Sequence, residues 1–140
     1  MALIYLQLRP ESPPPLQDVS GLSPFRAVVV IQEPVSEKWQ SEVSGWLVQA
    51  GCLYMMAWGS ECSSWDDSVD IANLEQFNYE EVPEAKFVMT TWHENEPLKE
   101  VFWFSKNNAF HPVVEIKNTL ILDVSNTSHE QEFLAEYNHA

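Results

Sequence analysis

Residues 52–70, CLYMMAWGSECSSWDDSVD, decide the fold: an apolar run ends at Gly59 and gives way to an acidic segment that contains serines. The run predicts a buried strand, and the acidic segment predicts the start of a helix. In open α/β sheets, binding groups lie on the loops at the carboxyl ends of strands, close to helix N-termini. We therefore expect the functional residues of this chain on this loop and on its neighbours.

The preceding segment completes a βαβ unit. Residues 25–32, FRAVVVIQ, form a β-branched run without polar alternation, which is typical of a central strand covered on both faces. Between the two strands, apolar residues recur at helical spacing, with Ser36 as the expected N-cap and Gly51 as the expected left-handed residue after the helix. The members of this apolar stripe are Trp39, Val43, Trp46, Leu47 and Ala50. Residues 25–58 thus have the length and order of a parallel crossover unit.

The rest of the chain continues the alternation. We expect a helix to about residue 77 with Ser64 in a capping box, a strand at 86–92, a helix from Pro97, a strand at 119–124 and a last helix capped by Ser128. This order predicts an α/β fold of three layers. Its four-stranded, mainly parallel sheet would carry helices on both faces, like half of a flavodoxin-like or Rossmann-like fold. In the order 2-1-3-4, the loops after the first and third strands would diverge around the switch point.

The N-terminal region differs in composition from the remainder. Residues 3–8 could add an edge strand, but five prolines between residues 10 and 24 exclude regular structure there. We therefore expect residues 1–24 to form a strand and a Pro-rich arm, and residues 25–140 to form a single α/β domain.

The charge of the chain restricts its partners. Seven basic against 21 acidic residues among 140 give a net charge of −14, and no basic residue lies between Lys38 and Lys86. Binding to nucleic acid draws its affinity from Lys and Arg, so we expect no nucleic-acid partner. Partners should be neutral, cationic or metal-bridged, although the same acidity also serves solubility alone.

Other features concern location and cofactors. Two cysteines are too few for a disulfide scaffold, and no leader segment is recognisable, which predicts a reducing, cytoplasmic location. No apolar run reaches the ~18 residues of a membrane span. With only four glycines and no phosphate-binding loop, we expect no nucleotide or other cofactor. The sequence makes no prediction of the oligomeric state.

Several segments of the sequence resemble those of a known family. FRAVVVIQEPVS, SGWLVQAGCLYMMAWG, CSSWDDSVD, FVMTTWHENEPLKEVFWF and TLILDVS are similar to a family of small bacterial α/β proteins of unknown function, over about residues 25–125. The resemblance implies one cytoplasmic bacterial domain. It assigns no catalytic residue.

One crevice at the strand ends could collect the chemistry-bearing side chains. Its expected members are Glu33, Glu61, Cys62, Ser63, Trp65, Asp66, Asp67, His93, Glu94 and Glu96. In a nucleophilic enzyme, such as a hydrolase or transferase, Cys62 near a helix N-terminus would attack, His93 would be the base and Glu94 or Asp66 would orient the imidazole.

A metal site is a second hypothesis for the same crevice. Asp66 and Asp67 with His93, Glu94 or Glu96 would suit Mg²⁺ or Ca²⁺, and the imidazole would admit Zn²⁺ or Mn²⁺. No recognised ligand spacing is present, and acids at a helix N-terminus are favourable without any metal, so we predict no metal site from the sequence.

The third hypothesis, which we rank first, is an interaction protein of immunity or regulatory type. An acidic surface with exposed aromatic residues would bind a basic protein partner, as in barstar-like inhibitors, to which only size and charge are analogous. The expected binding residues are Glu61, Trp65, Asp66, Asp67, Asp70, Trp92, Glu94 and Glu96. The alternative is the small-molecule or metal-binding enzyme that uses Cys62 and His93.

Overall fold

A computed structural model describes residues 2–13 and 19–140. The strands are β1 (Leu3–Leu8), β2 (Phe25–Ile31), β3 (Cys52–Gly59), β4 (Met89–His93) and β5 (Asn118–Val124). The helices are α1 (Glu37–Ala50), α2 (Cys62–Gln76), α3 (Leu98–Asn107) and α4 (Glu130–His139), with short 3-10 turns at Ser20–Leu22 and Glu84–Lys86. None of these helices is long and apolar enough to cross a membrane.

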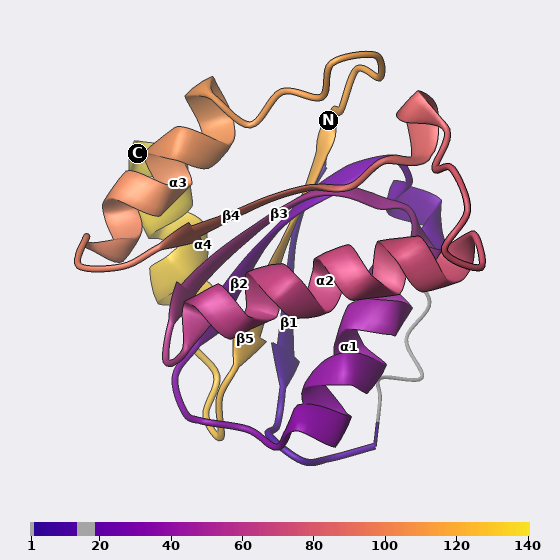
Figure 1. The fold of residues 1–140 in the computed structure, drawn as a ribbon. Helices are drawn as coiled ribbons and strands as arrows, with labels where there is room; N and C mark the ends of the chain where they lie inside the picture. Colours follow the sequence, from indigo (N-terminus) through magenta and orange to yellow (C-terminus); the bar gives the residue numbers. More distant parts are fainter. Residues whose placement is uncertain (1, 14–18) are drawn as a thin grey trace.

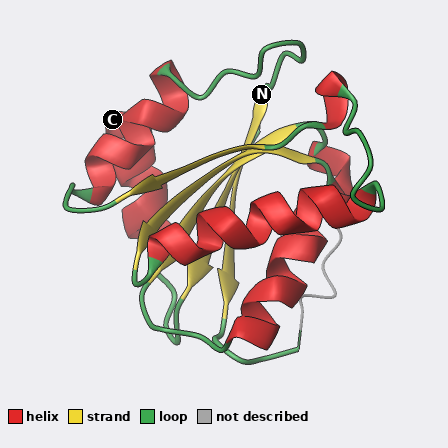
Figure 2. Cartoon of the chain, viewed as in Figure 1, coloured by secondary structure: helices red, strands yellow, loops and turns green. Residues whose placement is uncertain are grey.

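The α/β class predicted from the sequence is confirmed, with five strands in place of four. One parallel sheet has the order β1-β5-β2-β3-β4, so that the fifth strand is the N-terminal edge strand. Helices α1 and α2 cover one face and α3 and α4 the other (Figures 1 and 2). Each face packs its own apolar core, and β2 contributes to both, as expected of a central strand.

The conjectured strand order is wrong. Strand β2 lies between β5 and β3 and does not pair with β4. Because α3 lies on the opposite face from α1 and α2, the connection from β4 runs back across β3 and β2 and places β5 on the far side of β2. The loops that diverge at the candidate site are therefore those after β3 and β4.

The local signals around α1 are confirmed. The side chain of Ser36 accepts a hydrogen bond from the backbone N–H of Trp39, and Gly51 ends the helix with a φ of 106°. Upstream, the Glu11 carboxylate accepts hydrogen bonds from the backbone N–H and the hydroxyl of Ser36 at 2.6 Å each, which ties the arm to the helix start. Residues 1 and 14–18 of the predicted strand and arm lie outside the described residues.

Three predicted details differ from the structure. Helix α2 begins at Cys62 with Glu61 as its N-cap, so Ser64 lies inside the first turn and donates to the Glu61 carbonyl. Strand β4 begins at Met89 and leaves Phe87 exposed, because a 3-10 turn occupies the residues before it. The last helix begins at Glu130, one residue after its N-cap His129.

Candidate functional site: an acidic pocket and helix face beside β3 and β4

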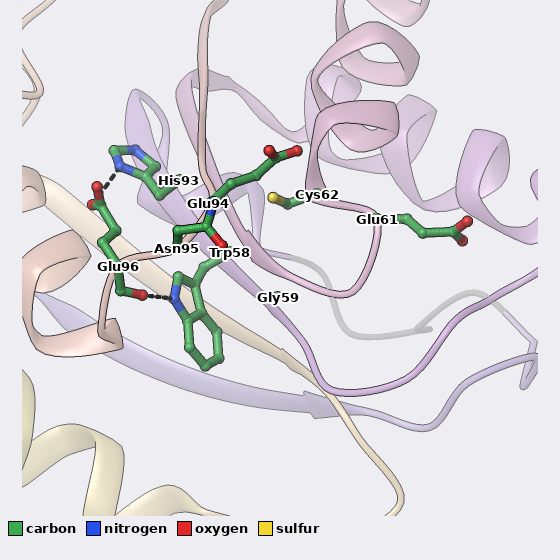
Figure 3. A pocket seen from close by; sticks show the side chains of 8 residues that line it. All are labelled: Trp58, Gly59, Glu61, Cys62, His93, Glu94, Asn95 and Glu96. Atoms are coloured by element: carbon green, nitrogen blue, oxygen red, sulfur yellow. Dashed lines mark hydrogen bonds and ion pairs between the residues drawn. The ribbon is translucent and has the colours of Figure 1, made fainter.

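The carboxyl ends of β3 and β4 border a pocket of about 450 Å³ (Figure 3). Strand β3 leads into α2 on one face of the sheet and β4 leads into α3 on the other, so the two loops separate and leave a crevice between them. The pocket is lined by Trp58, Gly59, Glu61, Cys62, His93, Glu94, Asn95 and Glu96. Three of these residues are glutamates and none is Lys or Arg, so the lining is acidic.

The backbone around the pocket adopts uncommon conformations. Gly59, Glu61 and Asn95 have φ values of 105°, 50° and 60°, all in the left-handed region. A Cβ on Gly59 would stand 2.1 Å from the carbonyl oxygen of Ile31. Such residues cluster at binding and catalytic sites, where the surrounding structure holds them in place.

His93 belongs to the pocket, but both of its ring nitrogens have partners. Nδ1 lies 2.9 Å from a carboxylate oxygen of Glu96, and Nε2 lies 2.9 Å from the Thr91 hydroxyl. The buried ring also packs edge-on against Phe104, with centroids 4.9 Å apart. These contacts fix the imidazole as a structural link between the end of β4 and the following loop.

Cys62 also lines the pocket, and its sulfur points towards the loop of His93 and Glu94, whereas the Glu61 carboxylate points the other way (Figure 3). The residue is only 2% exposed. Burial raises the pKa of its thiol, against the lowering effect of the His93 backbone, and the negative charge of Glu94 raises it further. The thiol therefore stays protonated near neutral pH. These features weigh against the predicted pairing of Cys62 with His93 as nucleophile and base.

Next to the pocket, α2 carries a cluster of three aspartates. Asp66, Asp67 and Asp70 each offer a carboxylate oxygen, and these oxygens lie within 4.8 Å of one another. Asp70 accepts a hydrogen bond of 2.8 Å from the hydroxyl of Thr90 on β4. Burial raises the pKa of the Asp70 carboxyl, and the charges of Asp66 and Asp67 raise it further, against the lowering effect of Thr90.

The two tryptophans predicted for binding have opposite environments. Trp65 is 1% exposed and packs edge-on against Trp39, so it belongs to the core between α1 and α2. Trp92 is 50% exposed. It shares one face of β4 with Thr90, because side chains two residues apart on a strand point the same way, and Thr90 binds Asp70 of α2. Trp92 is therefore the aromatic residue beside the acids.

Besides Trp65, Asp66 and Asp67, two more residues predicted for the crevice do not line the pocket. The carboxylate of Glu33 accepts a hydrogen bond from Asn126, at the carboxyl ends of β2 and β5. Its absence from the pocket follows from the strand order, which separates β2 from β4. Ser63 is exposed in the first turn of α2 and does not line the pocket.

Asp123, Tyr5 and His129 form a polar cluster that was not predicted from the sequence. The fully buried Asp123 accepts hydrogen bonds from the Tyr5 hydroxyl at 2.5 Å and from the His129 ring at 2.8 Å. The backbone N–H of His129 donates to the same hydroxyl at 2.9 Å. This cluster joins β1, β5 and the start of α4. The one sequence feature that could have indicated this cluster is the acidic Asp123 inside the otherwise apolar run TLILDV.

The comparisons with known proteins give a family and no activity. The profile of a domain of unknown function, DUF7684, matches residues 3–140. The predicted resemblance to a family of unknown function is thereby confirmed over a longer segment. No curated protein matches the sequence. A solved structure described as a crystal structure of an hypothetical protein is 12% identical and covers 83% of this chain and 72% of its own, with a TM-score of 0.47.

Proposed function

We propose that this chain, which belongs to the DUF7684 family of domains of unknown function, is an interaction protein that binds a basic protein partner. The binding surface is the acidic face, defined as Glu61, Asp66, Asp67, Asp70, Trp92, Glu94 and Glu96. These residues come from the start of α2, the end of β4 and the loop after β4.

The observation that carries the proposal is the uncompensated charge of this face. Between residues 39 and 85 there is no Lys or Arg. Across residues 2–13 and 19–140, the ion pairs join His93 to Glu96 and His129 to Asp123, and no carboxylate pairs with Lys or Arg. Carboxylates without cationic partners create a negative potential, which accelerates and orients the approach of a positively charged protein.

Trp92 supplies an anchor for such a complex. Aromatic residues that become desolvated at the centre of an interface contribute much of the binding energy, and acidic neighbours exclude unwanted apolar partners. The half-exposed Trp92 lies beside Asp70 through their common neighbour Thr90. Trp92 thus takes the anchoring role that the sequence analysis assigned to Trp65, which is buried.

The position of β4 supports the same surface. It is one of the two outer strands of the sheet, opposite β1, and is paired only with β3 in the described part of the chain. Its sequence, MTTWH, lacks the Lys and Pro that commonly protect exposed edges. A partner segment lying along this edge would meet Trp92 and the carboxylates of α2 together.

The test is affinity capture from the source organism with three baits. The first is the wild-type chain, and the second combines Asp67→Lys, Glu94→Lys and Trp92→Ala, all exposed residues of the acidic face. The matched control combines Glu130→Lys, Glu132→Lys and Trp103→Ala, because Trp103 is 48% exposed on the opposite side of the sheet. We expect a basic protein on the wild-type and control baits only, with retention that weakens as salt is raised. Equal retention on all three baits would place the interface elsewhere.

A second candidate function is small-molecule binding in the pocket between β3 and β4. It is favoured by the left-handed backbone at Gly59, Glu61 and Asn95. The carboxylates of Glu94 and Glu96 would select a cationic ligand, and an enzyme of this site would use these carboxylates rather than the protonated Cys62. Native mass spectrometry of the purified chain tests it: a bound cation lost in Glu94→Gln would support this function over the first.

A further inference from the structure

The three aspartates of α2 differ from an ordinary acidic helix start in one respect. Asp66 is only 8% exposed, and its Oδ1 atom is buried without a hydrogen-bond partner. A buried carboxylate oxygen without a partner is unfavourable, so a ligand at this position would stabilise the protein. One carboxylate oxygen each of Asp67 and Asp70 lies within 4.8 Å of a carboxylate oxygen of Asp66, where like charges repel.

We propose that Asp66, Asp67 and Asp70 form a binding site for a hard divalent cation, with Ca²⁺ preferred over Mg²⁺. The three residues occupy positions i, i+1 and i+4 of one helix, and their ligand oxygens lie within 4.8 Å of one another. A cation among them would neutralise their mutual repulsion and would give the buried Asp66 carboxylate a partner of opposite charge.

The spacing and the donor type select the ion. Ca²⁺–oxygen distances of about 2.3–2.6 Å place opposite ligands about 4.6–5.2 Å apart, whereas Mg²⁺ draws them to about 4.2 Å in a strict octahedron. A span of up to 4.8 Å lies within the reach of the larger and more flexible Ca²⁺ shell, whereas the strict Mg²⁺ octahedron would draw the three carboxylates closer together. All the donors are carboxylates, and His93 packs against Phe104 on the other face of β4, so Zn²⁺ lacks the nitrogen or sulfur ligands that it prefers.

The site is open on one side, because Asp67 is exposed. Water would complete the coordination shell, and one short helical segment supplies every protein ligand. We therefore expect a dissociation constant of about 10⁻⁴ to 10⁻³ M, the range of weak calcium modules. The cation site does not rest on the proposed protein partner, but its three aspartates belong to the acidic face, so a bound cation would lower the negative charge of that face.

The experiment measures calcium binding to the purified chain alone. At 10 mM CaCl₂, linkage predicts that the wild-type Tm rises by about 5 to 9 °C relative to NaCl of equal ionic strength. Asp66→Asn and Asp67→Asn should abolish the rise, and Glu42→Gln, which removes an exposed carboxylate of α1, should keep it. Tb³⁺ in place of Ca²⁺ should show luminescence sensitised by tryptophan, and Asp66→Asn should lose it.

A rise in Tm that is the same in Asp66→Asn and wild type, or the same in NaCl, would overturn the proposal. A rise with MgCl₂ larger than that with CaCl₂ would overturn the choice of ion. Because no partner is present, these results are separate from the outcome of the capture experiment.

Discussion

Replacement of Asp66 by Asn should stabilise the metal-free protein. The carboxylate of Asp66 is buried, lacks a partner for Oδ1 and lies within 4.8 Å of the carboxylates of Asp67 and Asp70. At this distance one pair of like charges repels by about 0.9 kcal/mol in water and about 3.5 kcal/mol at an effective dielectric constant of 20. Because Asp67 is exposed, the lower figure applies better, and two such repulsions sum to about 2 kcal/mol.

We therefore expect Asp66→Asn to increase the free energy of unfolding by about 1 to 2 kcal/mol in EDTA. With an m-value of about 2 kcal/mol/M, the urea midpoint should rise by about 0.5 to 1 M at unchanged slope. Glu42→Gln is the control and should stay within about 0.5 kcal/mol of wild type. A midpoint that falls by 0.5 M or so in Asp66→Asn would show that the carboxylate makes a favourable contact, and would refute the reasoning.

Three further outcomes follow from the structure. Gly59→Ala should lower the free energy of unfolding by about 3 kcal/mol, because φ is 105° and the new Cβ would meet a backbone carbonyl of β2, and urea titration checks this. Burial raises the pKa of Cys52 to about 12 and also raises that of Cys62, so iodoacetamide should modify both slowly at pH 7.5 and fast only in denaturant. Hydrogen bonds from Ser36 lower the pKa of the Glu11 carboxyl below its ordinary 4.5. The ionised Glu11 therefore stabilises the folded state above pH 4.5, and this stabilisation is lost as the pH falls through the lower pKa of the folded state. The Tm difference between wild type and Glu11→Gln should accordingly be larger at pH 7 than at pH 2.5, and an equal difference would contradict it.

The local parts of the fold could be predicted because their signals are local. The apolar run of β2, the Ser36 cap and the left-handed Gly51 each depend on a few neighbouring residues, and the structure confirms them. The order of the strands has no such signal. It depends on which face α3 covers, and this is decided by packing between segments distant in sequence.

The candidate site was predicted in part. Residues Cys62, His93, Glu94 and Glu96 do meet at one pocket, because β3 and β4 are adjacent parallel strands. The prediction that Trp65 binds a partner was wrong. Helix α2 begins at Cys62, so Trp65 lies in its first turn on the side that faces the core, where it packs against Trp39.

The cluster of Asp123 and its partners could not be found from spacing. Tyr5 and Asp123 are 118 positions apart, and they meet only because the N-terminal strand pairs with β5. Once that pairing is known, the acid in the buried strand is the residue that needs explanation.

Hydrogen exchange with the captured partner tests the central claim most directly. Amides of β4 and of the first turns of α2 should exchange more slowly in the complex than in the free chain, since the acidic face would be covered there. The fluorescence of the half-exposed Trp92 should change in the same titration. Slower exchange confined to α4 and β1, with β4 and α2 unchanged, would contradict the proposed interface.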